Sequence, residues 1–225
     1  MVQKQLLISL RNLRSKKMKK TKKLYDISML ISENIIVYPG NEKVSINQYA
    51  FRPEDSVNES SITMGCHTGT HIDAPFHVKN TGKKAHQIHL ESFYGRCRVL
   101  DLTEVDLEIH SDHLELFDLK KGEIILLKTK NSLRGYKEFR KDFIHVKLDA
   151  AEYMIKKGIK TLGCDYLSVK QFGGDDKVHE MLINNLTLFE GLNLKDVSEG
   201  EYIFIGLPLK LVCDGAPARA ILVEE

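Results

Sequence analysis

Long hydrophobic runs are absent from this sequence of 225 residues, and their absence narrows the class of protein. No apolar stretch approaches the roughly 20 residues that a helix needs to span a bilayer, so we expect no membrane partner. The opening stretch "MVQKQLLISLRNLRSKKMKK" holds only a short apolar block and no small-residue cleavage site. We therefore expect a protein of the cytoplasm.

Cysteine is also scarce, and its few copies are scattered. The four cysteines form no C-x-x-C pair and stand at Cys66, Cys97, Cys164 and Cys213. This spacing suggests neither a zinc knuckle nor a disulfide framework, so we expect reduced thiols. Cys66 directly precedes a histidine, but a lone cysteine is more often a small buried apolar residue than a metal ligand.

Acidic residues are missing from the first 23 residues, which carry nine lysines or arginines. The remainder holds 24 basic and 31 acidic residues, a net charge of −7. A basic run of this kind is typical of a solvated, disordered arm, which we predict for residues 1–23. Nucleic-acid binding by the arm is a weaker alternative, because no aromatic residues are interleaved with the lysines, and we expect no nucleic-acid partner.

The rest of the chain, residues 24–225, predicts a single strand-rich domain of the mixed α/β class. With 42% apolar residues, the chain is long enough to bury one sizeable core. The runs "CRVLDL" and "EIILLKT" are typical of strands buried on both faces, and "IKTLGCDYLSV" predicts another buried strand. No internal repeat is present.

Two helices are expected in the second half of the chain. "LDAAEYMIKKG" places apolar residues at helical spacing and ends at Gly158, and "VHEMLINN" predicts a second, short helix. A tight turn is expected at Pro39-Gly40. The other predicted strands lie in "LYDISMLI", "IIVYPGNEKVSINQYAF", "IHLESF", "LTLFEGLNL" and "EYIFIGLPLKLV".

The stretch "HTGTHIDAPFH", which begins at His67, concentrates three of the nine histidines and one aspartate. Glycine, two β-branched threonines and Pro75 argue against a helix, so an extended or looped backbone is expected. On an extended segment His71 and Asp73 point to the same side. Gly69 allows the chain to bend so that His67 joins them.

Two imidazoles and one carboxylate form a three-ligand set for a borderline divalent metal, with Zn²⁺ the first choice and Mn²⁺ the alternative. Such a set leaves a coordination position for water, which indicates catalysis. His77 follows the rigid Ala74-Pro75 corner and is expected to carry protons rather than bind the metal. The alternative of another class is a non-catalytic metal-binding module, although structural zinc sites usually have four protein ligands.

The same stretch resembles a known family. "HTGTHIDAPFH" is similar to the H-x-G-T-H-x-D-x-P-x-H signature of the cyclase-like metal-dependent hydrolases, which include bacterial kynurenine formamidase and isatin hydrolase. The resemblance runs from about Leu24 to Glu224, with further segments matching in order. These are "LYDISMLISENIIVYPGN", "LGCDYLSV", "HEMLINNLTLFEGLNL" and "LPLKLVCDGAPARAIL".

The resemblance implies that His67, His71 and Asp73 bind a first metal ion. It also implies that Asp73 bridges to a second ion held by His179 and Glu190, which stand eleven residues apart where the family usually has twelve. Independently, Asp73 has two oxygens that can span two cations. Glu190 interrupts an apolar run, where a buried acid needs a partner.

The fold and reaction follow from the same resemblance. It implies a swivelling β/β/α-like cyclase-family fold, a homodimer or larger homo-oligomer, and one or two Zn²⁺ per chain. The implied reaction is hydrolysis of an amide bond by a metal-bound hydroxide, with His77 as the catalytic proton shuttle. The implied substrate is an aryl formamide such as N-formylkynurenine, split to formate and the amine in an arylformamidase reaction of tryptophan catabolism. A cyclic amide of the isatin type is the alternative.

Residues that contact the substrate are less sharply indicated. Aromatic residues near a site more often belong to the hydrophobic core than to the wall of a substrate pocket. Four of them are nevertheless candidates for that wall: Tyr38, Phe76, Tyr166 and Phe172. Three late residues are expected either to order the final loop or to meet the substrate: Asp214, Gly215 and Arg219.

Two other features have ordinary interpretations. His86 and His89 lie in the predicted strand "IHLESF" and its lead-in, where their spacing puts them on opposite faces in surface roles. Gly173-Gly174 lacks the context of a phosphate loop and predicts a flexible turn beside the site.

Overall fold

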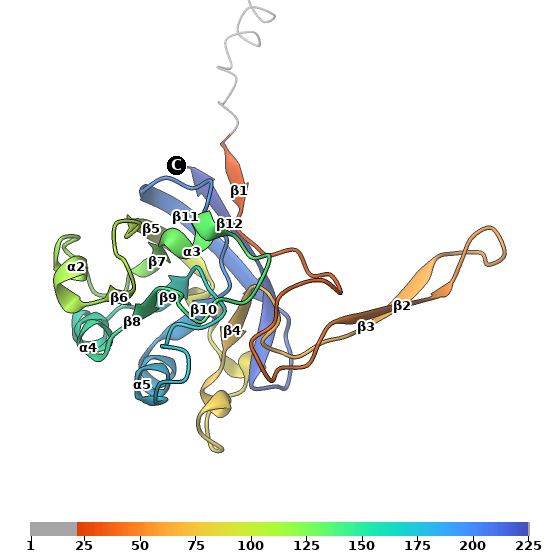
Figure 1. Cartoon of the computed structure of the whole chain (residues 1–225), viewed down its shortest axis with the longest axis horizontal. Coiled ribbons are helices and arrows are strands. Elements are labelled where there is room, and N and C mark those ends of the chain that lie inside the picture. Colours follow the sequence, from red (N-terminus) through yellow and green to blue (C-terminus); the bar gives the residue numbers. More distant parts are fainter. Residues whose placement is uncertain (1–21, 225) are drawn as a thin grey trace, which may run out of the picture.

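A computed structural model describes residues 22–224, which form a strand-rich α/β body with one projecting hairpin (Figure 1). Of the basic arm predicted for residues 1–23, all but Lys22 and Lys23 lies outside the described residues. Within residues 22–224, no helix combines the length and the apolar character that crossing a membrane requires.

Eight strands of the described chain form one large sheet. They are β1 (Leu24–Asp26), β4 (His71–Asp73), β5 (Tyr94–Asp101), β7 (Ile124–Lys128), β9 (Thr161–Cys164), β10 (Thr187–Glu190), β11 (Gly200–Pro208) and β12 (Gly215–Glu224). β4 pairs with both β10 and β12, so the sheet closes on itself, and β1 pairs with the other end of β12. The prediction of a mixed, strand-rich α/β fold is confirmed.

The centre of the sheet is parallel, with β5, β7, β9 and β10 side by side. Parallel neighbours need crossover connections, and these carry the helices. The helices are α2 (Ser111–Glu115), α3 (Lys130–Arg134), α4 (Leu148–Lys157) and α5 (Lys177–Asn185), with a small sheet of β6 (Glu108–Ile109) and β8 (His145–Val146). Both helices expected from the sequence, α4 and α5, are confirmed.

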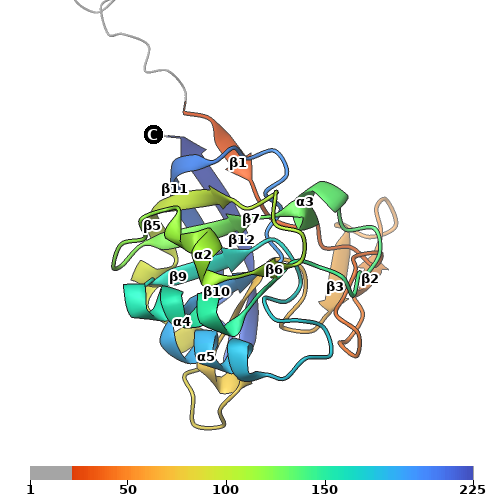
Figure 2. The same ribbon diagram turned by 60° about the vertical axis from the view of Figure 1, so that its left-hand side comes forward.

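Burial on both faces explains the apolar run of β7. Ile125 and Leu127 pack in the cluster beneath α4 and α5, which lie side by side outside the sheet (Figure 2). Ile124 and Leu126 point the opposite way and pack with Phe189 inside the closed sheet. The alternation follows from the two-residue period of a strand. As predicted, both faces are buried.

A hairpin of β2 (Ser45–Ala50) and β3 (Glu59–Thr63) projects from the body (Figure 1). Nearly all of its residues are exposed, including Ile46 and Ile62. The expected turn at Pro39-Gly40 precedes it, with Gly40 at a φ of +97°. The extended structure predicted for this segment is present as β2. The local sequence pattern does not show that β2 pairs only with β3, in a sheet separate from the main one.

The segment "IHLESF" is not a strand, and that prediction is wrong. The chain here forms the 3₁₀ turns η2 (Ala85–Gln87) and η3 (Leu90–Ser92). The N–H groups of Ile88, Ser92 and Phe93 bond to carbonyls three residues earlier, and those of Ala85 and His86 bond to the loop before β12. His89 is exposed and His86 is half-buried in this surface loop, so neither lies on a strand face.

Four predicted strands are shorter than the runs that indicated them. β1 ends at Asp26, β9 at Cys164, β10 at Glu190 and β11 at Pro208. Gly191 has a φ of +69° and turns the chain away from the sheet after β10, while proline lacks the N–H that would continue a ladder. The remainders of the runs form loops.

All four cysteines are free, as predicted. Cys97 and Cys164 are buried, and burial raises the pKa of the Cys97 thiol to about 12. Cys66 is only partly buried, contrary to the expectation of a buried residue, and its thiol is hydrogen-bonded to that of Cys213.

Candidate metal centre

The bend expected in "HTGTHIDAPFH" is present at Gly69, whose φ of +62° lies in the left-handed region. The chain then enters the short strand β4. On one edge of β4, His71 lies opposite Glu190 of β10; on the other edge, Asp73 lies opposite Gly215 of β12. The closure of the sheet therefore brings residues together that are far apart in the sequence.

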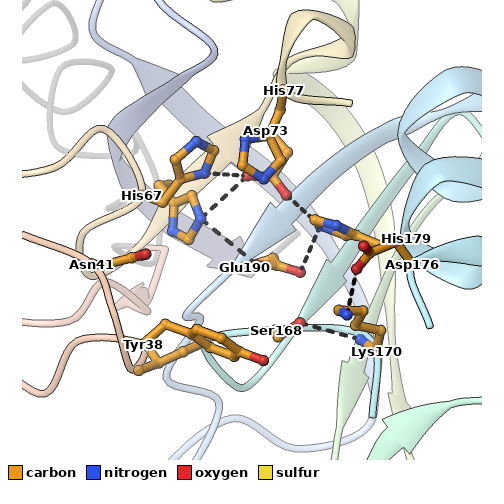
Figure 3. Close-up of a pocket in the computed structure, with 12 residues that line it drawn as sticks. Tyr38, Asn41, His67, Asp73, His77, Ser168, Lys170, Asp176, His179 and Glu190 are labelled. Carbon is orange, nitrogen blue, oxygen red and sulfur yellow. Dashed lines mark hydrogen bonds and ion pairs between the residues drawn. The ribbon is translucent and has the colours of Figure 1, made fainter. Parts of the chain in front are cut away.

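Asp73 is the centre of the site (Figure 3). Its Oδ1 lies 2.7 Å from His67 Nδ1 and 3.3 Å from His71 Nε2. Its Oδ2 lies 2.8 Å from Nε2 of His179, which projects from α5. One buried carboxylate thus contacts three imidazoles, each of which the sequence predicted as a metal ligand.

His71 is oriented as a metal ligand would be. Its Nδ1 lies 2.9 Å from the carbonyl oxygen of Gly69 and donates to it, because a carbonyl can only accept. The lone pair is therefore on Nε2. That atom is buried and has no hydrogen-bond partner among the described residues, although Asp73 and Glu190 stand near it. A hydrogen bond from the other ring nitrogen to a backbone carbonyl fixes the tautomer of a ligating histidine.

Glu190 reaches the same point from β10. Its Oε2 lies 3.7 Å from His71 Nε2, and its Oε1 lies 3.7 Å from His179 Nε2. Oε1 also accepts a hydrogen bond of 2.8 Å from the backbone N–H of Val169. The interval of eleven residues does not separate His179 from Glu190, because α5 ends at Asn185 and β10 begins at Thr187.

The two buried carboxyl groups differ in charge. Burial raises the pKa of Asp73, but hydrogen bonds from His179 and His67 outweigh it and hold this pKa well below its usual value. Burial and the adjacent charge of Asp73 raise the pKa of Glu190 well above its usual value. The cluster thus holds an ionised Asp73 beside a Glu190 that favours its proton, which a cation could replace.

His67 is engaged through both ring nitrogens. Nδ1 contacts Asp73, and Nε2 lies 2.8 Å from Oδ2 of Asp214. Burial lowers the pKa of His67, but the hydrogen bonds and charges of these two carboxylates outweigh it and raise the pKa to about 9. An Nε2–H bound to Asp214 would leave the Nδ1 lone pair for a cation beside Asp73.

His77 stands at the mouth of the site, at the end of η1 (Pro75–His77). Its Nδ1 lies 3.2 Å from Oδ2 of Asp214, and its ring centroid lies 4.1 Å from that of His67. Burial lowers the pKa of His77, so the neutral ring that can accept a proton is favoured. His77 is an exposed residue, with 34% of its side chain open to solvent.

The structure brings all six predicted site residues together. The candidate ligand atoms of His67, Asp73 and His77 lie within 4.8 Å of one another, and so do those of His71, Asp73 and Glu190. His179 joins them through Asp73. Imidazole nitrogens and carboxylate oxygens in this mixture fit a borderline divalent ion.

A cavity of about 260 Å³ opens in front of these residues. Six further residues line it: Tyr38, Asn41, Leu167, Ser168, Lys170 and Asp176. Tyr38 is backed by Phe172, at 5.8 Å between ring centroids. The other two aromatic candidates do not line the cavity: Tyr166 is buried and stacked on Phe143, and Phe76 lies under the Lys84 ammonium.

The late residues have separate roles. Asp214 bridges His67 and His77, a role that the sequence left open between ordering a loop and meeting substrate. Gly215 allows a close approach, because a Cβ there would lie 2.7 Å from the His67 ring. Arg219 pairs with Asp26 at the surface and is structural.

Sequence reasoning missed the polar wall of the cavity. Gly173-Gly174 was expected in a turn beside the site, and Gly173 does adopt a φ of +70° there. The residues flanking this turn, Lys170 and Asp176, both line the cavity. The signal available was a pair of opposite charges on either side of a turn shortly before His179.

The chain matches the model of the Cyclase family, described as "Putative cyclase", over residues 25–171. The chain belongs to this family. The family resemblance noted in the sequence is therefore confirmed. Kynurenine formamidase of Bacillus cereus is 35% identical over 209 residues, which cover 90% of this chain and 98% of that protein. Kynurenine formamidase of Salinibacter ruber is 35% identical over 204 residues, covering 88% and 96%.

Solved structures of the family share the fold. A predicted metal-dependent hydrolase from Bacillus stearothermophilus superposes with a TM-score of 0.81 at 36% identity, covering 91% of this chain and all of that chain. An isatin hydrolase bound to the product analogue thioisatinate superposes with a TM-score of 0.79 at 22% identity, covering 97% and 98%. These likenesses agree with the cyclase-family fold expected from the resemblance.

Proposed function

We propose that the protein is a metal-dependent hydrolase that cleaves the C–N bond of a small aromatic amide, with an aryl formamide such as N-formylkynurenine as substrate. The observation that carries the proposal is the buried lone pair of His71 Nε2, directed at Asp73 and Glu190 without a hydrogen-bond partner among the described residues. A buried acceptor in that position is costly unless a cation meets it.

The ligands would divide around Asp73. His67, His71 and one oxygen of Asp73 would hold a first ion, and the other oxygen would join His179 and Glu190 at a second. A divalent metal bound there lowers the pKa of water and polarises a carbonyl oxygen. The remaining chemistry is the movement of one proton from the attacking water to the leaving nitrogen.

His77 is the group placed to move that proton. Its Nδ1 faces Asp214, so an N–H there leaves Nε2 free to take a proton from water as the new C–O bond forms. His77 then returns the proton to nitrogen as the C–N bond breaks. Formate and the free aryl amine are the products of a formamide.

The formamide substrate is favoured over a cyclic amide by the extent of similarity. Two proteins named kynurenine formamidase share 35% identity with nearly the whole chain, whereas the isatin hydrolase shares 22%. An assay of the formamide should therefore include an isatin-type cyclic amide as the alternative substrate.

The test is metal content together with formate release from N-formylkynurenine. His71→Ala and Asp73→Ala should lose bound metal and turnover together, because each removes a ligand at the centre of the cluster. His77→Ala should keep the metal and lose at least about 100-fold in kcat, the usual contribution of a general acid–base group. Full activity in His71→Ala, or loss of metal in His77→Ala, would contradict the assignment.

Three finer points remain predictions from the sequence. Zn²⁺ is preferred over Mn²⁺, the assembly is a homodimer or larger, and the protein acts in the cytoplasm. Elemental analysis of the purified protein addresses the metal and its number per chain, and two ions per chain would favour the second site at Glu190. A non-catalytic module would bind metal yet release no formate from any aryl formamide.

A further inference from the structure

Opposite charges line the cavity next to the reactive histidines. Lys170 and Asp176 flank the Gly173-Gly174 turn, and Lys170 Nζ lies 2.5 Å from Asp176 Oδ1. Figure 3 shows both beside His179, on the side of the cavity away from His67. The Asp176 carboxylate also interacts electrostatically with His77 and His179.

The pair has spare bonding capacity. The Lys170 ammonium has three protons, of which one is donated to Asp176 and another to the carbonyl of Gly174 at 3.0 Å. Only one oxygen of Asp176 is bonded within the described part of the chain, and the side chain is 68% exposed. Each charge can therefore accept a ligand group without giving up its partner.

An aromatic wall lies near the same pair. Both charges act on the Tyr38 phenol, which also lines the cavity. Tyr38 packs against Phe139 at 5.4 Å and Phe172 at 5.8 Å between centroids. The cavity thus offers an apolar ring surface, an adjacent positive and negative charge, and the reactive cluster within one space of about 260 Å³.

We propose that Lys170 and Asp176 form a clamp for a zwitterion, so that the enzyme selects aryl formamides that carry an α-amino acid group. This inference rests on the proposed formamide hydrolysis. Lys170 binds the α-carboxylate, Asp176 binds the α-ammonium, and the ring lies against Tyr38 with its formamide toward Asp73. A neutral bicyclic amide of the isatin type cannot use either charge.

A purely structural ion pair is the competing explanation. Exposed pairs often contribute little to stability, and Lys170 with Asp176 could simply close the loop. The two explanations differ in what they predict for substrates that lack one charge, because a structural pair would affect all substrates alike.

The experiment compares four aryl formamides with the same ring and ketone. N-formyl-L-kynurenine has both charges, 4-(2-formamidophenyl)-4-oxobutanoate has only the carboxylate, formylkynuramine has only the ammonium, and N-(2-acetylphenyl)formamide has neither. Formate release is measured for the metal-loaded wild type, Lys170→Met and Asp176→Asn.

Lys170→Met should raise KM about tenfold or more for the two substrates with a carboxylate, and Asp176→Asn should do so for the two with an ammonium, as expected for a lost charge-assisted hydrogen bond. Neither residue touches the reacting atoms, so any change in kcat, including one caused by the lost Asp176 charge near His77, should be the same for all four substrates. The KM of the neutral formamide, which carries neither charge, should change less than about twofold in both variants. Thermal unfolding shows that both variants fold.

Asp175→Asn and Lys177→Met are matched controls, because these neighbours carry the same charges but do not line this cavity. Neither should change any KM. Calorimetry with L-kynurenine provides a readout without turnover, and its Kd should rise about tenfold in Lys170→Met and Asp176→Asn but not in the controls.

The outcomes separate the two proposals. Equal changes in KM for charged and neutral substrates, or no change in KM for any substrate, would overturn the clamp while leaving formamide hydrolysis in place. If the wild type releases formate from none of the four substrates, the proposed function itself fails.

Discussion

At the scale of single residues, Asp214 connects His67 of the candidate metal centre to His77, the proposed proton carrier. Its Oδ2 lies 2.8 Å from His67 Nε2 and 3.2 Å from His77 Nδ1. Burial raises the pKa of Asp214, but the hydrogen bond and charge of His67 outweigh it, and the net shift is downward. One ionised carboxylate therefore sets the ring orientation of both histidines.

We predict that Asp214→Asn lowers metal affinity and kcat by about 10- to 100-fold each, the usual effect of losing a partner of a ligating histidine. The amide keeps the size of the side chain but no longer holds both imidazoles as a carboxylate does. Metal affinity is measured with a competing chelator, and kcat by formate release. Asp196→Asn, a distant charge change, serves as the control. Unchanged values in Asp214→Asn would show that the two contacts are incidental.

At the scale of elements, α5 links the core to the candidate metal centre. His179 and Leu182 are three residues apart and lie on the same face of the helix. Leu182 is fully buried in the cluster that α4 and α5 form with the sheet, whereas Glu180 is exposed. The packing of Leu182 therefore fixes where His179 meets Asp73.

Leu182→Ala should lower the free energy of unfolding by about 2–5 kcal/mol, the range for a leucine truncated in a core. It should also lower the occupancy of the proposed second metal site, because α5 would hold His179 less firmly. Urea unfolding and elemental analysis measure the two effects. Glu180→Ala, on the exposed side of α5, should change stability by less than about 0.5 kcal/mol. If Leu182→Ala lost stability but kept its full metal content, the packing of α5 would not control the position of His179.

At the scale of the whole molecule, the candidate metal ligands come from segments that only the closed sheet assembles. The loop before β4, β4 itself, α5 and β10 each supply part of the set. The unfolded chain does not hold these groups together. A bound ion would therefore stabilise the entire fold by mass action.

Removing metal with a chelator should lower Tm by about 5–10 °C, since metal at 100 times its Kd contributes about 2.7 kcal/mol and each kcal/mol shifts Tm by about 2–4 °C in a chain of this size. Differential scanning calorimetry of metal-loaded and chelated protein measures the shift. His77→Ala should retain it and His71→Ala should not respond to the chelator. The same Tm with and without metal would mean that no ion bridges these segments.

Local pattern predicted those features that depend on residues close in the sequence. Backbone preferences and periodicity within a few residues explain the extended segment from His71 to Asp73 and the bend at Gly69. They also explain the helices α4 and α5. The family signature added His179 and Glu190, which no local spacing connects to Asp73. The strand predicted for "IHLESF" failed because N–H groups of this segment bond to carbonyls three residues earlier, in 3₁₀ turns, while Ala85 and His86 just before it bond to a distant loop.

The sequence by itself determined the chemistry of this protein: which imidazoles and carboxylates are present, and which of them one bent segment must hold together. Only the tertiary structure decided that Asp214 joins His67 to His77 and that Lys170 and Asp176 face the same cavity as Tyr38. The physical reason is that these neighbours meet through closure of the sheet between β4 and β12 and through a loop before α5. Such long-range contacts depend on packing of the whole chain, so spacing along the sequence does not by itself show which residues make them.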